Sequence, residues 1–177
     1  AEDEVVKTPQ AEALSEAKQS APLADLVEIS SPLSGQVKEL SQATDPVFAQ
    51  GVMGQGVLIE PSQGDLLAPV DGVVSVLFPT KHAVGIVSDQ GVEMLMHIGM
   101  DTVNLEGKGF TAHVSQGDRV KAGDKLISFD IDLIKDAGYV TETPVIITNQ
   151  DQYQADALGS LPRQIAVGDA LMTATKI

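Results

Sequence analysis

The sequence TKHAVGIVSDQGVEMLMHIGMDTV occupies residues 80–103 and holds two of the three histidines of the chain, His82 and His97. β-Branched and other apolar residues stand on both sides of a Ser-Asp-Gln-Gly cluster at residues 88–91. Two apolar runs joined by such turn residues are typical of an antiparallel β-hairpin. We therefore predict a hairpin that carries both histidines.

The length of the loop decides which residues face one another across this hairpin. An even loop centred between Asp89 and Gln90 places His82 opposite His97, with their Cβ atoms about 5 Å apart on one face. An odd loop with a bulge would move the pairing by one residue. We expect the even register, in which Val84 shares the face of the two histidines.

The alternation along the second strand separates two surfaces. His97 and Leu95 point to one side, and Met96 and Met94 point to the other. Both sides are largely apolar. We expect one side to pack on a core and the other to present the histidine pair within a hydrophobic surface.

From residue 29 onward, short apolar runs alternate with glycine-containing turns, which is typical of an all-β domain. Two patterns recur: Pro-x-x-Gly-x-Val-x-x-Leu at 32–40 and 69–77, and Val/Ile-x-x-Gly-Asp-x-Leu at 120–126 and 165–171. We predict an antiparallel β-sandwich or barrel with internally duplicated motifs and one or two short helices. One helix is expected over Asp132–Ala137, capped by Asp130 or Asp132 and ended by Gly138.

The first 27 residues have a different composition, acidic and rich in Ala, Ser and Gln. Too few apolar residues recur there at helical spacing to dock a helix on a core. We predict that residues 1–27 form an acidic flexible linker or tail and that residues 28–177 form one folded domain.

Composition excludes several classes of function. A net charge of −14 argues against nucleic acid as a partner and favours a basic protein. The absence of cysteine excludes disulfides and thiolate metal sites, and it is compatible with the cytoplasm. No run of about 18 apolar residues is present to span a membrane.

Five segments together resemble a known family over nearly the whole chain after residue 29. They are APVDG at 68–72, FPTKHA at 78–83, HIGMDTV at 97–103, GDRV at 117–120 and TPV at 143–145. In this order and spacing they resemble the enzyme IIA component, glucose type, of the bacterial phosphoenolpyruvate-dependent sugar phosphotransferase system. The wording around His82 and over residues 138–144 is more similar to IIA domains of sucrose, trehalose or β-glucoside permeases than to the free glucose protein.

The resemblance implies a phosphotransferase component. His97 would accept a phosphoryl group from the histidine-containing phosphocarrier protein and pass it to the cysteine of a IIB domain during sugar uptake. His82 would be the second active-site histidine, with Thr80 beside it. The residues agree with this chemistry, because an ordinary imidazole is largely neutral and nucleophilic near pH 7. Thr80 on its own is equally an ordinary strand threonine.

The resemblance also implies a docking surface around the histidines. Asp45 matches an acidic rim position, and Asp101 either adds to that rim or caps the following turn. Six apolar residues match an exposed patch that binds partners, although from the residues alone they are equally core: Val47, Phe48, Val52, Phe78, Leu95 and Val103. We expect the domain to work in the cytoplasm, either free or as the cytoplasmic domain of a membrane permease.

Two other functions use the same residues. A biotinyl- or lipoyl-like carrier shares the glycine cadence, but it needs a lysine at a hairpin tip, and the tip here is Asp89-Gln90-Gly91. A histidine-based zinc hydrolase would need a third ligand and a base, for which His113 and Glu93 are candidates. We expect no cofactor and no metal of the domain's own, with zinc held by the two histidines only when a partner carboxylate or a crystal contact completes the site.

Overall fold

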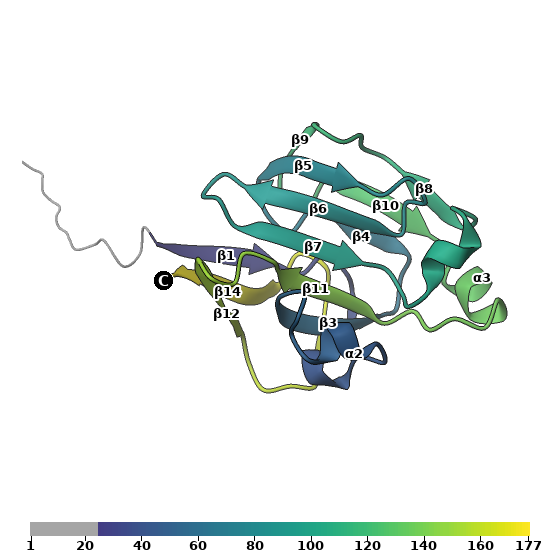
Figure 1. Cartoon of the computed structure of the whole chain (residues 1–177), viewed down its shortest axis with the longest axis horizontal. Helices are drawn as coiled ribbons and strands as arrows, with labels where there is room; N and C mark the ends of the chain where they lie inside the picture. Colours follow the sequence, from purple (N-terminus) through teal and green to yellow (C-terminus); the bar gives the residue numbers. More distant parts are fainter. Residues whose placement is uncertain (1–24) are drawn as a thin grey trace, which may run out of the picture.

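The computed structural model describes residues 25–177, and these form fourteen strands, two short α-helices and two 3₁₀ turns (Figure 1). The strands are β1 (Leu26–Ser30), β2 (Gly35–Glu39), β3 (Gln55–Pro61), β4 (Asp65–Leu67), β5 (Gly72–Leu77), β6 (Ala83–Ser88), β7 (Glu93–His97), β8 (Phe110–Ala112), β9 (Arg119–Val120), β10 (Lys125–Phe129), β11 (Thr143–Ile147), β12 (Tyr153–Ala157), β13 (Arg163–Ile165) and β14 (Ala170–Lys176). The helices are α2 (Pro46–Ala49) and α3 (Ile131–Asp136), and the 3₁₀ turns are η1 (Leu40–Gln42) and η2 (Thr102–Leu105).

The strands form a large sheet and two small ones, all antiparallel. The large sheet has the order β13-β2-β3-β11-β7-β6-β5-β9, and the small sheets are β1-β14-β12 and β4-β10-β8. In Figure 1 the strands β5, β6, β7, β11 and β3 lie side by side, with β10 behind them. The predicted all-β sandwich with two short helices is confirmed.

The repeated sequence patterns occupy equivalent places. β2 and β5 carry the first pattern, and each pairs with a short strand at one edge of the large sheet, β13 and β9 respectively. Their flanking hydrogen bonds also match: Ser31 exchanges backbone bonds with Gly168 and Asp169, as Ala68 does with Gly123 and Asp124. The internal duplication predicted from the sequence is therefore a duplication of structure.

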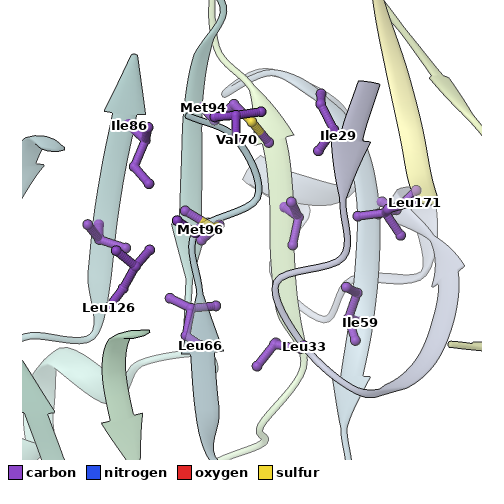
Figure 2. Close-up of a cluster of buried hydrophobic side chains, with 14 of the residues drawn as sticks. Ile29, Leu33, Ile59, Leu66, Val70, Ile86, Met94, Met96, Leu126 and Leu171 are labelled. Carbon is purple, nitrogen blue, oxygen red and sulfur yellow. The ribbon is translucent and has the colours of Figure 1, made fainter. Parts of the chain in front are cut away.

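The main core lies between the large sheet and the two small sheets. Figure 2 shows side chains from several strands meeting there, among them Ile86 on β6, Met94 and Met96 on β7, and Leu126 on β10. All four are at most 2% exposed. Burying one such side chain contributes roughly 1.5–3 kcal/mol, so this cluster fixes where β6 and β7 lie.

A second, smaller apolar cluster lies on the outer face of the same sheet. Leu58, Leu95 and Ile146 belong to it, whereas their neighbours along each strand point into the main core. The segment containing η1 and α2 covers this outer face. The buried members of the outer cluster are Leu40, Ala43, Phe48, Leu58, Ala83, Leu95, Met100 and Ile146.

Two predicted boundaries can be compared with the structure. β1 begins at Leu26, two residues before the predicted domain start at residue 28, because Val27 is buried and pairs with Ala174 of β14. The rest of the predicted linker, residues 1–24, lies outside the described residues. Helix α3 is confirmed, with the Asp130 carboxylate accepting from the Leu133 backbone N–H.

The predicted register of the hairpin is wrong by one residue. Ala83, not His82, pairs with His97, and Val87 pairs with Glu93. The reason is the turn: the Ser88 backbone N–H donates to the Val92 carbonyl, and the Val92 N–H donates to Ser88 Oγ, around a three-residue loop whose last member, Gly91, has φ 105°. A three-residue loop ending in a left-handed glycine shifts the pairing relative to an even loop, and it turns Val84 into the core rather than towards the histidines.

Within residues 25–177, no helix has the length and apolar character needed to cross a membrane.

Candidate functional site

The two imidazoles lie side by side on the outer face of the large sheet, although their residues are not directly opposed. His97 ends β7, and His82 comes immediately before β6. The turn before His82 contains Lys81 at φ 62°, so the regular alternation of β6 does not extend to His82. The ring centroids are 4.9 Å apart with an interplanar angle of 80°. The predicted proximity of the histidines is confirmed even though the predicted register is wrong.

A backbone carbonyl fixes the proton on His97. Its Nδ1 lies 2.8 Å from the carbonyl oxygen of Gly99. Because a carbonyl only accepts, Nδ1 must carry the hydrogen, which leaves the lone pair on Nε2. Gly99 has φ 73°, and an added Cβ would lie 2.6 Å from Thr102 Cγ2 and 2.7 Å from the Val140 carbonyl oxygen. Only glycine therefore fits at this position.

A hydroxyl holds the second ring. Thr80 Oγ1 lies 2.6 Å from Nδ1 of His82. When the hydroxyl donates to Nδ1, the hydrogen of a neutral His82 is on Nε2. Phe78 packs edge-on against this ring at 5.3 Å, and His82 is only 3% exposed. The predicted contact between Thr80 and His82 is confirmed.

The surroundings keep both rings neutral near pH 7. Burial, helped by the nearby His97, lowers the pKa of His82 from 6.5 to about 4. Burial also lowers the pKa of His97, while the Gly99 carbonyl and the charges of Asp45 and Asp101 act in the opposite direction. A neutral imidazole with a free Nε2 is the form that attacks an electrophile.

One wall of the site is α2, a single helical turn. Its start is fixed by Asp45, whose carboxylate accepts from the Val47 backbone N–H at 2.9 Å, followed by Pro46 in the first turn. This places the Phe48 ring 5.2 Å from the His97 ring. Phe48 is 6% exposed and covers His97 from that side.

The predicted docking residues differ in their exposure. Val47, Val52 and Val103 are exposed, at 46%, 66% and 49%. Phe48 and Leu95 are buried in the outer cluster, so their expected exposure is wrong: α2 closes over Leu95, and Phe48 packs inward on His97.

The other three predicted docking residues lie nearer the surface. Phe78 and Asp45 are half-buried, and Asp101 is exposed. Asp101 makes no side-chain cap for η2, so its turn-cap alternative is not what the structure shows. The partner-binding role of all eight residues stays a prediction.

Several residues at the site were not singled out from the sequence. Gly99 could have been found, because a glycine just after a strand often marks a left-handed backbone. Met53 and Val140 are two further exposed apolar residues, at 42% and 43%, and the Val140 carbonyl lies against Gly99. Glu142 is a charged residue at the entrance to an apolar strand, which is itself an unusual position.

The candidate residues for a zinc centre do not assemble. Within the described range 25–177, no group of three His, Cys, Asp or Glu side chains could hold a metal ion. His113 is exposed and bonds to Ser128 through Nε2. A hollow of about 690 Å³ lies between α3, β8 and β10, and neither His82 nor His97 lines it. That hollow is thus separate from the histidine pair.

Comparison with known proteins supplies relatives of this chain. A Bacillus subtilis protein named PTS system beta-glucoside-specific EIIBCA component is 58% identical over 125 residues, which are 71% of this chain and 20% of that protein. A Bacillus cereus PTS system glucose-specific EIIA component is 54% identical over 123 residues, 70% of this chain and 74% of that protein. The chain thus spans about a fifth of the beta-glucoside relative but most of the glucose-specific one.

A solved structure agrees with the sequence relatives. Glucose permease IIA from Mycoplasma capricolum matches with a TM-score of 0.75 and 35% identity, covering 84% of this chain and 95% of that one. The family described as phosphoenolpyruvate-dependent sugar phosphotransferase system, EIIA 1, matches residues 27–153, which include both histidines and all of the segments that carried the resemblance. The chain therefore belongs to the EIIA 1 family of the phosphoenolpyruvate-dependent sugar phosphotransferase system.

Proposed function

We propose that this domain carries a phosphoryl group on Nε2 of His97, taken from the histidine-containing phosphocarrier protein and passed to the cysteine of a IIB domain during sugar uptake. The observation that carries the proposal is the hydrogen bond from His97 Nδ1–H to the Gly99 carbonyl, next to a second neutral imidazole. It leaves one nucleophilic nitrogen with its lone pair free.

The transfer balances as two displacements at phosphorus. In the first, the Nε2 lone pair of His97 bonds to phosphorus, while the donor's N–P bond breaks and its electron pair stays on the donor imidazole. The phosphorylated ring keeps its Nδ1 hydrogen and is therefore cationic. The Gly99 carbonyl and the carboxylates of Asp45 and Asp101 are placed to stabilise that cation. In the second, a thiolate bonds to phosphorus and the electron pair returns to Nε2.

The role proposed for His82 is to donate a hydrogen bond to the phosphoryl oxygens. Its neutral tautomer, with Thr80 at Nδ1, has Nε2–H available for this. Burial keeps His82 uncharged before transfer, so it does not repel a protonated or phosphorylated His97.

The partner surfaces follow from the exposed residues. Val47, Val52 and Val103 are exposed, and we propose that with Asp45 and Asp101 they make an apolar docking surface with acidic edges, which suits a partner carrying an apolar face and cations. The relatives named EIIBCA components support a IIB domain as the acceptor, tethered or separate. We place the reaction in the cytoplasm.

The proposal is tested by the intact mass of the domain after incubation with phosphoenolpyruvate, the general phosphotransfer enzyme and the histidine phosphocarrier protein. One added phosphoryl group that is labile in acid and stable in base is the expected result. The control omits the phosphocarrier protein and should show no addition. Persistent absence of any addition with all three components, tested on a folded sample, would contradict the proposal.

A further inference from the structure

Glu142 is a buried carboxylate that binds a segment far away in the sequence. It stands immediately before β11 and is 7% exposed. One carboxylate oxygen accepts from the backbone N–H of Thr44 at 2.5 Å, and the other accepts from Thr44 Oγ1 at 2.8 Å. Both oxygens of Glu142 are thus committed to a single residue 98 positions away.

Burial of the Glu142 carboxylate costs free energy, and the hydrogen bonds to Thr44 offset that cost. Burying a carboxylate carries a desolvation penalty, and among residues 25–177 Glu142 forms no ion pair to offset it. The compensation comes from two hydrogen bonds to a charged acceptor, which are stronger and more directional than neutral ones. Such a pair selects one placement of the backbone at residue 44.

Thr44 leads directly into the wall of the site. The next residue, Asp45, caps α2, and α2 carries the Phe48 ring that lies 5.2 Å from His97. A helix of one turn has little stability of its own. Its placement over the histidine therefore depends on what holds its two ends, and Glu142 holds the N-terminal one.

The segment that contains Glu142 also contacts Gly99 and Met100, which follow His97 in the chain. The Val140 carbonyl accepts from the Met100 backbone N–H at 3.2 Å and lies against Gly99, whose own carbonyl orients the His97 ring. Residues 140–142 thus connect the support of the His97 ring with the segment that covers it.

We propose that Glu142 is a positioning residue that holds the Thr44–Phe48 segment over His97, so that Phe48 keeps water away from the phosphorylated ring. This inference rests on the function proposed above. In this role Glu142 does not react itself but lengthens the lifetime of the phosphohistidine. Water that reaches phosphorus competes with the thiolate of the acceptor.

The test compares three substitutions with a matched control. Glu142→Ala removes both hydrogen bonds, Glu142→Gln keeps two polar contacts without the charge, and Thr44→Val removes only the hydroxyl. The control is Glu60→Ala, because Glu60 accepts from Thr141 Oγ1 at 2.6 Å in the same strand-entry segment but does not contact residue 44. Measurements are the hydrolysis rate of the phosphorylated protein and the NMR cross-relaxation between the Phe48 and His97 rings in the unphosphorylated protein.

The expected result is a graded loss. The phosphorylated Glu142→Ala variant should hydrolyse roughly 10-fold faster, which corresponds to about 1.4 kcal/mol of activation free energy, and the unphosphorylated variant should lose the Phe48–His97 cross-relaxation. Thr44→Val and Glu142→Gln each keep part of the hydrogen bonding and should show smaller changes, whereas Glu60→Ala should stay near the unmodified protein. In the Glu142→Ala background, Thr44→Val should add nothing.

Two outcomes would overturn the inference. One is unchanged hydrolysis and ring contact in Glu142→Ala; the other is equal acceleration in Glu142→Ala and Glu60→Ala, which would mean general loosening. If Glu142→Ala does not fold, Thr44→Val tests the inference instead. Unchanged hydrolysis and ring contact in that variant would refute the positioning role of Glu142. If the unmodified protein takes no phosphoryl group, the proposed function fails. The cross-relaxation between the Phe48 and His97 rings still tests whether Glu142 positions Phe48.

Discussion

The inner and outer faces of the β6–β7 hairpin use the same two strands for different purposes. On the inner face, Val84, Ile86 and Met96 are fully buried in the main core. On the outer face, the half-buried ring of His97 and the buried ring of His82 lie within a thin layer made by α2 and its neighbours. The inner face fixes the backbone, and the outer face displays side chains from it.

The outer face buries a pair of histidines without placing them in the main core. Moving two imidazoles out of water lowers their pKa values and favours the neutral forms. The aromatic rings against the two imidazoles, Phe48 of α2 and Phe78, belong to the outer cluster and not to the main core. Chemistry on the outer face and stability from the inner face should therefore be separable by substitution.

The largest expected effect is on the outer face. His97→Ala removes the nitrogen proposed to accept the phosphoryl group, so acceptance should be abolished while the cooperative unfolding transition is kept. Intact mass after the phosphorylation reaction measures this, and His113→Ala is the control, since His113 is exposed and apart from the site. Phosphorylation of His97→Ala to the same extent as the unmodified protein would show that His97 is not the acceptor.

The inner face should give the opposite result. Met96→Ala leaves a cavity in the main core and should lower the free energy of unfolding by about 2–5 kcal/mol. Because its side chain points away from the histidines, acceptance per folded molecule should change little. Denaturant unfolding and phosphorylation, measured on the same sample, check both halves. A large loss of acceptance without a loss of stability would show that the two faces are not separable.

The pH dependence of stability sharpens the role of burial. His82 has a pKa of about 4 in the folded protein against 6.5 ordinarily, so between these pH values the unfolded state binds more protons. The stabilisation is therefore complete above pH 6.5 and is lost as the pH falls towards 4. His82→Gln should remove on the order of 1–3 kcal/mol of this pH dependence. Urea midpoints of both proteins across this range measure it, and parallel curves would contradict the burial argument.

The smallest expected effect concerns the hydroxyl behind His82. Thr80→Val removes the hydrogen bond at Nδ1, worth about 1 kcal/mol, and should slow onward transfer roughly 3- to 10-fold with acceptance nearly unchanged. The matched control is Thr148→Val, whose hydroxyl bonds to the Glu93 carbonyl at the far end of the hairpin. Rates of phosphoryl transfer to a IIB domain separate the two variants. Equal rates would show that the Thr80 hydroxyl has no role in onward transfer.

The sequence predicted the inner face better than the outer one, for physical reasons. Period-two alternation in β7 correctly predicts that Met94 and Met96 lie on the opposite face from His97, because a buried face enforces the alternation. The register was missed because Gly91 adopts a left-handed conformation that makes the loop odd. The Ser-Asp-Gln-Gly cluster fits both an even loop and a three-residue loop with glycine at its left-handed position, so the local pattern does not decide between them.

The covering layer was missed because it depends on contacts distant in the sequence. The burial of Phe48 depends on α2, whose Asp45-Pro46 start is a readable cap signal, but also on Glu142, which is 98 residues from Thr44. The histidine pair itself was predicted through the family resemblance and the hairpin, while the Lys81 turn that brings His82 alongside His97 has no strong local signature.

In the proposed function, Nε2 of His97 is the nitrogen that carries the phosphoryl group. The most direct measurement is the ¹⁵N–³¹P coupling in the phosphorylated protein labelled with ¹⁵N at histidine. The geometry predicts a one-bond coupling at Nε2 of His97, with Nδ1 of the same ring still protonated and bonded to Gly99. A phosphoryl group on Nδ1 of His97, or on either nitrogen of His82, would contradict it.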